Sequence, residues 1–444
     1  MVTTPIDVAD PSEWRGHEQR QHLYRHMLTR MLVIGILAIA TVATALPLRA
    51  EDKPILLLSM KDPFARAYSQ NREKVHDTLG VNLNVELLDY ESVNRALAVN
   101  SLRKQSDYDL VAVDIVWVSD YASHGALLPL QLLVSDHRVD GSDFIDLAWE
   151  GGQFDGKQFA LPIQPHPEVL IYRLSVLRRL NLKPPKTTDD VIEIARRVEE
   201  EIPNMHGICW NAASGAALGQ QMLHFAAAFG APVLRPDGSF TVSDPGWVKA
   251  FEYAKTLATL SPPQISEMAW DVRMAHFGMG SCAMTYAWGA AIAGLEEVGS
   301  TIAGDIGYAA APHAPGYSPV TPLGSWLLAI PANLAPDRIP AALDALLRLT
   351  SADGARLLLE LGVSASPRRS QTLGASRSYS ILKLVDELDH SGELATWMRP
   401  AVQGFQGLSE IIGVEAHAAL FDGVPVSTAL ARINGRVNDQ GEVP

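Results

Sequence analysis

Cysteine is scarce in this sequence: 444 residues contain only two, Cys209 and Cys282. Two cysteines cannot build the disulfide framework of a small secreted domain, and their spacing forms neither a CxxC pair nor a zinc site. Basic residues are also in deficit, with 36 Lys and Arg against 50 Asp and Glu and a formal net charge of -14. Because binding to a phosphate backbone needs clustered Lys and Arg, this charge argues against a nucleic-acid partner.

The sequence has no apolar run long enough to cross a bilayer as a helix, which takes about 20 residues. Its longest apolar run, residues 31–46 (MLVIGILAIATVATAL), is shorter than that and follows a leader containing four arginines. Such a run is typical of a secretory signal peptide. We therefore expect residues 1–50 to be a leader and signal peptide, cleaved after Ala43 and Ala45 or after Ala50. An uncleaved membrane anchor is the alternative.

The motifs of common enzyme active sites are missing as well. The sequence contains no G-x-S-x-G, no H-E-x-x-H, no P-loop and no dinucleotide-binding G-x-G-x-x-G after an expected strand. His276 and His313 have no ligand partner three or four positions away, and acidic pairs such as Asp189-Asp190 lie on expected helix faces. We therefore expect no catalysis, no cofactor and no metal site.

What is present is an alternating α/β pattern. Apolar residues make up 47% of the sequence, and at roughly 100–200 residues per domain the length suits two or three packed cores. Short apolar runs alternate with amphipathic stretches, which predicts strands joined by crossover helices. Strands are expected at 55–58, 81–88, 110–113, 169–172, 207–210, 282–286, 306–311 and 327–330. Helices are expected at 63–79, 91–99, 188–198, 244–260, 341–349 and 352–361.

Polar and aromatic residues gather where the expected strands end. Ligands of parallel α/β sheets bind beyond the carboxyl ends of strands, which here points to Lys61-Asp62 and to Asp114 with Trp117. Tryptophan follows other expected strands, at Trp210, Trp288 and Trp326. Aromatic faces beside hydrogen-bonding side chains suit a ligand with C–H faces and many hydroxyl groups. This pattern indicates a sugar or polyol, although simple core packing would also explain each tryptophan.

Several longer motifs occur in a recognisable order. They are YDLVAVDIVWVSDYASHGALLPL (108–130), FDGKQFALPIQPHPEVLIYRLSVLRRLNLKPPKTTDDV (154–191), MAHFGMGSCAMTYAW (274–288), LGSWLLAIP (323–331) and GVSASPRRS (362–370). In this order they resemble the extracellular solute-binding proteins of bacterial ABC importers, family 1, the carbohydrate-binding type. The resemblance covers essentially all of residues 51–444.

The resemblance implies a two-lobed periplasmic-binding-protein fold, type II-like, in which each lobe is a mostly parallel sheet flanked by helices. It places residues 51–164 plus 312–352 in the first lobe and residues 165–311 plus 353–444 in the second. A monomeric periplasmic protein of this kind binds a sugar or polyol in the cleft and delivers it to ABC transporter permease subunits. Ligand binding would favour the closed state of the lobes.

The resemblance also implies which residues bind the ligand. They are Lys61, Asp62, Asp114, Trp117, His166, Asn211, Tyr286, Trp288, Ser325, Trp326 and Arg368. Two segments depart from the usual pattern, because Ser325 replaces a glycine and the hinge reads Gln164-Pro165-His166-Pro167. These departures leave the identity of the sugar open.

Alternative interpretations remain for these residues and for the chain. Asp62 and Asp114 could instead cap helices, Arg368 could pair with a carboxylate, and Asn211 could close a turn. A membrane-anchored sensor domain or a cleft enzyme acting on a carbohydrate could use the same fold. The sequence also leaves open whether the two cysteines form a disulfide, which requires that their strands be neighbours.

Overall fold

The computed structural model describes residues 53–135, 138–235, 239–296, 300–375, 380–400 and 402–440. The expected signal peptide lies outside these residues, whereas the chain from Pro54 onward forms one unit. Within the described part of the chain, no helix is long and apolar enough to cross a membrane.

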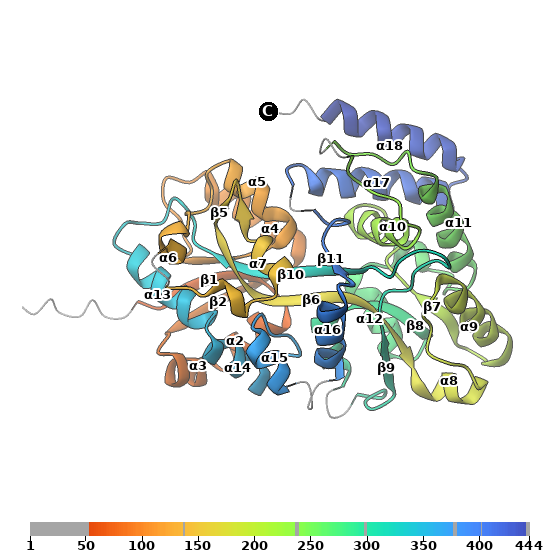
Figure 1. The fold of residues 1–444 in the computed structure, drawn as a ribbon, viewed down its shortest axis with the longest axis horizontal. Coiled ribbons are helices and arrows are strands. Elements are labelled where there is room, and N and C mark those ends of the chain that lie inside the picture. Colours follow the sequence, from red (N-terminus) through yellow and green to blue (C-terminus); the bar gives the residue numbers. More distant parts are fainter. Residues whose placement is uncertain are drawn as a thin grey trace, which may run out of the picture. The chain divides into compact units, whose positions relative to one another are not determined.

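A nine-stranded mixed sheet runs through the described residues (Figure 1). The strands are ordered β2-β1-β3-β10-β6-β8-β7, while β9 pairs with β6 and β11 pairs with β10. Their bounds are β1 (Ile55–Met60), β2 (Leu83–Leu88), β3 (Leu110–Asp114), β6 (Ala160–Arg173), β7 (His206–Cys209), β8 (Cys282–Trp288), β9 (Ile306–Ala309), β10 (Thr321–Ala329) and β11 (Leu394–Ala395). A separate ribbon pairs β4 (Gln153–Phe154) with β5 (Lys157–Gln158).

The helices fall into two groups, on either side of the central strands in Figure 1. Those up to β6 are α2 (Pro63–Gln70), α3 (Arg72–Leu79), α4 (Tyr90–Ser101), α5 (Val118–Ser123), α6 (Gln131–Ser135) and α7 (Asp146–Glu150). Those between β6 and β9 are α8 (Leu174–Leu180), α9 (Thr188–Glu201), α10 (Ala216–Ala228), α11 (Pro245–Thr259) and α12 (Trp270–Gly278). The later ones are α13 (Ile339–Leu349), α14 (Ala352–Glu360), α15 (Arg369–Ala375), α16 (Ser380–Ser391), α17 (Phe405–Phe421) and α18 (Val426–Gln440). Four short 3-10 helices are η1 (Ile115–Trp117), η2 (Gly141–Asp143), η3 (Ile265–Glu267) and η4 (Gly289–Leu295).

The sheet is parallel at its outer ends and antiparallel in the middle. β1 is parallel to both β2 and β3, and β7 is parallel to β8. β10 runs antiparallel to β3 and β6, and β6 runs antiparallel to β8 and β9. The parallel ends agree with the crossover pattern expected from the sequence, and the central strands β6 and β10 join them into one sheet.

Strand β6 links the two halves of the sheet. Its first part, as far as Pro167, pairs with β10, and its second part pairs with β8 and β9. The register with β10 shifts between Trp326 and Leu327, whose partners on β6 are Gln164 and Pro162. Such an irregularity locally bends a strand and re-aims its side chains. The residues around Gln164 are therefore turned at the point where the two halves meet.

The helix expected at 63–79 is two helices. α2 begins at Pro63, whose fixed φ suits a first helical position, and α3 ends at Gly80 in the left-handed conformation with φ 66. Asn71 lies between them with φ -123 and ψ 39, outside the helical region. The sequence gives no sign of this break, because neither glycine nor proline occurs within residues 64–79.

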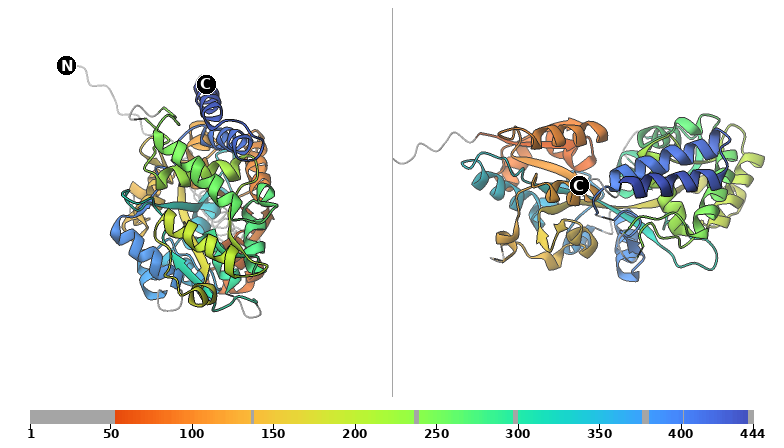
Figure 2. Two further views of the ribbon diagram at one scale, coloured as in Figure 1. Left: turned by 90° about the vertical axis from the view of Figure 1, so that its right-hand side faces the viewer. Right: turned by 90° about the horizontal axis from the view of Figure 1, so that it is seen from above.

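The packing of the C-terminal helices bears on the expected lobes. α17 contacts α10, α11 and α18, so it belongs with the helices of the second half (Figure 2). α14 instead packs against α2, α3 and α13, although the expected boundary after residue 352 gives it to the second lobe. We therefore propose the same division of lobes with this boundary moved beyond α14.

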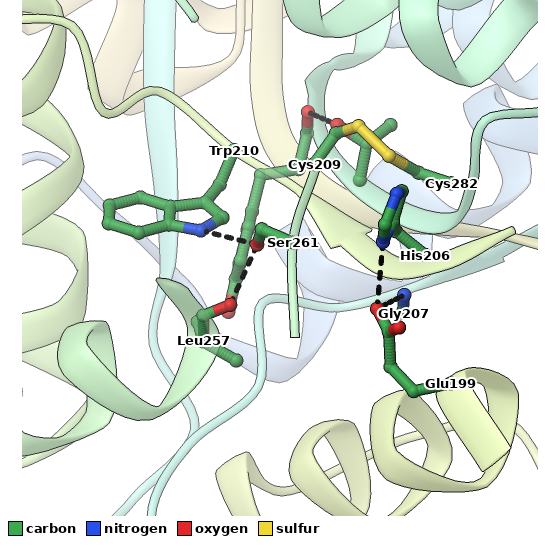
Figure 3. Close-up of a disulfide and its surroundings, with 10 residues drawn as sticks. Glu199, His206, Gly207, Cys209, Trp210, Leu257, Ser261 and Cys282 are labelled. Atoms are coloured by element: carbon green, nitrogen blue, oxygen red, sulfur yellow. Dashed lines mark hydrogen bonds and ion pairs between the residues drawn. A yellow bond between two sulfur atoms is a disulfide. The ribbon is translucent and has the colours of Figure 1, made fainter. Parts of the chain in front are cut away.

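Cys209 and Cys282 form a disulfide between the neighbouring parallel strands β7 and β8 (Figure 3). Their Cα atoms are 5.8 Å apart, a separation usual for a disulfide. Beside it, the Trp210 indole donates a hydrogen bond to Ser261 Oγ over 3.2 Å. The question left open by the sequence is thus answered by the pairing of the two strands.

Candidate functional site

A cavity of about 550 Å³ lies between the two groups of elements. Its volume is within the range of small-molecule sites. One side is formed by α2, Tyr90 of α4 and Asp114 of β3, and the other by α12, η4 and Trp288 of β8, while His166 of β6 and Trp326 of β10 also line it.

Six residues expected at the binding site line this cavity. They are Lys61, Asp62, Asp114, His166, Trp288 and Trp326. They come from α2 or the loop before it, β3, β6, β8 and β10, so the fold brings them together from distant parts of the chain. Contact between these residues and a ligand stays a prediction.

One face of α2 forms much of the wall. The lining residues Pro63, Arg66, Ala67, Gln70 and Asn71 follow a spacing of three or four. This is the spacing of a single helix face, so α2 borders the cavity over its whole length. At about 1.5 Å per residue, an eight-residue helix offers a wall of about 12 Å.

Asp62 stands at the N-cap of α2, yet its carboxylate makes no capping hydrogen bond. Its Oδ2 instead accepts a hydrogen bond of 2.9 Å from the Gln164 side chain. Burial raises the pKa of Asp62 to about 7, and hydrogen bonds from Gln164 and Trp326 partly oppose this shift. The capping role considered as an alternative is thus not what this carboxylate does.

Asp114 is the centre of a buried polar cluster. Its Oδ2 accepts a hydrogen bond of 2.8 Å from the Tyr90 hydroxyl and one of 3.1 Å from Arg399 Nη2. Arg399 and Asp114 are only 3% and 6% exposed. Burial raises the pKa of Tyr90 well above its usual value, and the charge of Asp114 adds to this effect. The Tyr90 hydroxyl therefore keeps its proton and acts as a donor to Asp114.

Arg399 also covers part of Trp288. Its guanidinium carbon lies 4.8 Å from the centre of a Trp288 ring, which is a cation–π contact. Gly324 makes room for this arrangement, since a Cβ there would lie 2.7 Å from Arg399 Nη1 and 3.1 Å from the Trp288 ring. One face of the tryptophan expected to stack on a sugar is therefore occupied by protein.

Aromatic rings close the cavity beside Asp114. The Tyr90 ring centre lies 4.8 Å from that of Trp117, 5.5 Å from Trp270 and 6.1 Å from Trp326. Trp117 is 1% exposed and lies behind this wall rather than on it. Trp270 is only partly buried and belongs to α12, so its contact with Tyr90 of α4 joins the two sides of the cavity.

A second charged cluster lies behind the wall on the side of α12. Arg273 Nη2 donates to Glu168 Oε1 over 2.8 Å, and His224 contacts the other carboxylate oxygen. Burial would raise the pKa of Glu168, but His224 and Arg273 outweigh it and lower the pKa to about 2. Because Glu168 lies on β6, this ion pair fixes α12 to the linking strand.

The remaining expected residues do not line the cavity. Tyr286 bonds through its hydroxyl to Tyr253, and Ser325 Oγ bonds to the carbonyl of Trp326. Asn211 is 1% exposed, and its backbone N–H faces the Gln221 side chain. Arg368 donates to the carbonyl of Thr350 and lies over the Phe144 ring. Each of these side chains is held in the surrounding structure, and Arg368 braces backbone rather than pairing tightly with a carboxylate.

The sequence did not single out Tyr90, Trp270, Arg273 and Arg399 as site residues. Tyr90 follows Asp89, the N-cap of α4, directly after β2. The rule that ligands bind beyond strand ends could therefore have found it. Arg399 lies in a loop between β11 and α17 and carries no such signal.

The chain belongs to the bacterial extracellular solute-binding proteins. The model of that family matches residues 69–346, which confirms the resemblance seen in the sequence. The chain is 28% identical over 245 residues to a probable ABC transporter-binding protein of Deinococcus radiodurans, covering 52% of this chain and 55% of the relative. It is 25% identical over 305 residues to a mannitol-binding protein of Pseudomonas aeruginosa, covering 66% and 69%. The match to the first relative thus spans little more than half of that protein.

Solved structures share the fold, which confirms the expected α/β periplasmic-binding-protein class. A solute-binding protein of Agrobacterium radiobacter K84 in complex with ribitol superposes with a TM-score of 0.81 at 24% identity, over 87% of this chain and 100% of that one. The maltose-bound protein MalE3 of T. maritima gives a TM-score of 0.79 at 20% identity, over 87% and 99%. Membership of this extracellular family means that the protein is exported.

Proposed function

We propose that this protein binds a sugar or polyol in the cavity and delivers it to the permease of an ABC transporter. The observation that carries this proposal is the pairing of hydrogen-bond acceptors and donors on the cavity wall. Asp62 and His166 offer acceptors, whereas Arg399 Nη1 and Gln220 Nε2 are buried donors with no partner among the described residues. A hydroxyl group both donates and accepts, so a polyhydroxylated ligand suits this wall.

The same proposal covers the location and the absence of chemistry. We propose that the protein acts in the periplasm as a monomer after cleavage of its signal peptide, because the apolar run at 31–46 is short. It releases its ligand unchanged, as expected for a member of a solute-binding family.

A thermal-shift screen tests the ligand class. The panel holds ribitol, mannitol, maltose and a charged control such as an amino acid. A ligand present at 100 times its Kd stabilises the folded state by about 2.7 kcal/mol, so a bound polyol or sugar raises Tm clearly. Tm unchanged by every polyhydroxylated compound, or turnover of a bound sugar by purified protein, would contradict the proposal.

Trp270→Ala is expected to weaken ligand binding about thirtyfold, or about 2 kcal/mol, as for large aromatic anchors in binding sites. Trp270 is partly buried and lines the cavity, unlike Trp288, whose ring is partly covered by Arg399. Isothermal titration with the best ligand of the screen measures the loss. Trp397→Ala is the matched control, because Trp397 is 39% exposed and lies outside the cavity. Equal Kd values for the two variants would show that Trp270 does not contact the ligand.

A further inference from the structure

Gln164 makes two side-chain hydrogen bonds to the start of α2 from a distant strand. It lies on β6 with no exposed surface. Its Oε1 accepts from the backbone N–H of Phe64 over 2.9 Å, and its Nε2 donates to Asp62 Oδ2 over 2.9 Å. One buried amide therefore contacts both the backbone of α2 and the carboxylate that precedes the helix.

The first of these bonds replaces a normal helix cap. An N-cap side chain usually accepts a hydrogen bond from one of the first backbone N–H groups of the helix. Asp62 occupies that position with extended backbone angles but makes no such bond, and Gln164 satisfies the N–H of Phe64 instead. The Asp62 carboxylate is consequently left free to line the cavity while Gln164 holds one of its oxygens.

Gln164 also fixes the protonation pattern of His166. The Nδ1 atom of His166 lies 2.8 Å from the carbonyl oxygen of Gln164. Because a carbonyl only accepts, Nδ1 must carry the proton in this contact, which makes Nε2 an acceptor. Burial lowers the pKa of His166 to about 4, so the ring is neutral at pH 7. The register shift of β6 beside Gln164 turns both residues to these positions.

We propose that Gln164 is a positioning residue of the binding site, which holds Asp62 and His166 as hydrogen-bond acceptors for two hydroxyl groups of the ligand. This inference rests on the proposed function and goes beyond it, because it assigns the specificity for hydroxyl donors to a residue that does not itself line the cavity. It also explains why this link is located on β6, the strand that joins both halves of the sheet.

The charges around Asp62 give the inference a pH signature. Asp114 on β3 raises the pKa of Asp62, Arg66 on α2 lowers it, and His166 and Arg399 line the same cavity. In the free protein the pKa of Asp62 is about 7. A ligand hydroxyl that donates to the ionised carboxylate lowers this value, so affinity is highest above pH 7 and falls as pH drops below it.

Gln164→Glu separates the two bonds of the amide. A glutamate keeps an oxygen for the N–H of Phe64 but cannot donate to Asp62 while ionised. We expect the Kd for ribitol or mannitol, whichever the wild type binds, to rise about tenfold at pH 8. The pH midpoint of binding should also move upward, because the lost hydrogen bond had lowered the pKa of Asp62. Gln164→Leu, which loses both bonds, should show at least the same rise in Kd.

Gln158→Leu is the matched control. Gln158 is also a buried glutamine, 2% exposed, but its Nε2 donates to the carbonyls of Ala160 and Trp149, away from the cavity. This variant should lower Tm without changing Kd or the pH midpoint. If folded Gln164 variants keep the Kd and the pH midpoint of a wild type that binds polyol, the inference is wrong. If the wild type binds no compound of the panel, the proposed function itself fails.

A measurement on the wild type covers the case in which neither Gln164 variant folds. Nitrogen-15 NMR of the histidine rings at pH 7 should show His166 protonated on Nδ1. Protonation on Nε2 would overturn the inference, because that ring could not accept a hydroxyl proton at the cavity.

Discussion

Arg399→Ala is expected to lower the free energy of unfolding by about 3–5 kcal/mol, the usual cost of removing one partner of a buried ion pair. The Arg399 and Asp114 side chains are 3% and 8% exposed, so the remaining carboxylate would keep only the Tyr90 hydroxyl as a partner. Chemical unfolding monitored by tryptophan fluorescence measures the change. Ligand affinity should fall as well, because Arg399 lines the cavity and covers part of Trp288.

Two further variants show whether burial of the pair causes this loss. Arg356 forms an ion pair with Asp353, but both side chains are more than half exposed, so Arg356→Ala should change the free energy of unfolding by less than about 1 kcal/mol. Asp114→Ala in the Arg399→Ala background removes the unpaired charge and should recover part of the lost stability. A double variant no more stable than Arg399→Ala would mean that lost packing, rather than the unpaired carboxylate, causes the instability.

The sequence predicted the parts of the site that follow strands. β3 is a run of fully buried residues ending at Asp114, and β10 places Trp326 directly opposite Asp114. Periodicity and burial therefore sufficed to put these residues at one edge. The break at Asn71 escaped detection because residues 63–79 hold no helix-breaking residue after the first position.

Residues whose positions depend on long-range packing could not be predicted. Arg399 reaches Asp114 across 285 positions of the sequence, and Gln164 reaches Asp62 across 102. No local pattern marks such pairs, since each depends on how β6 and the segment before α17 lie in the finished fold. Arg368 shows the opposite case, because a family motif marked it for the ligand while its guanidinium lies on Phe144 and bonds to backbone.

Loss of the disulfide is the second change with a large expected effect. Cys209 and Cys282 are 73 positions apart, and a cross-link closing a loop of this length restricts the unfolded chain enough to contribute about 4 kcal/mol in the chain-entropy model. Reduction of the wild type should therefore move the midpoint of chemical unfolding to clearly lower denaturant. Because reduction leaves both sulfur atoms in place, this difference reports the cross-link rather than lost packing.

The variant Cys209→Ala/Cys282→Ala provides the control. Its unfolding midpoint should not respond to reductant, and its Kd for the ligand should match that of the wild type, since neither cysteine lines the cavity. The disulfide also agrees with export, because such bonds persist in oxidising compartments and are rare in the cytosol. Thiol alkylation of the exported protein under denaturing conditions without reductant should label neither cysteine. Labelling of both would mean that strands β7 and β8 are held together by their ladder and their packing alone.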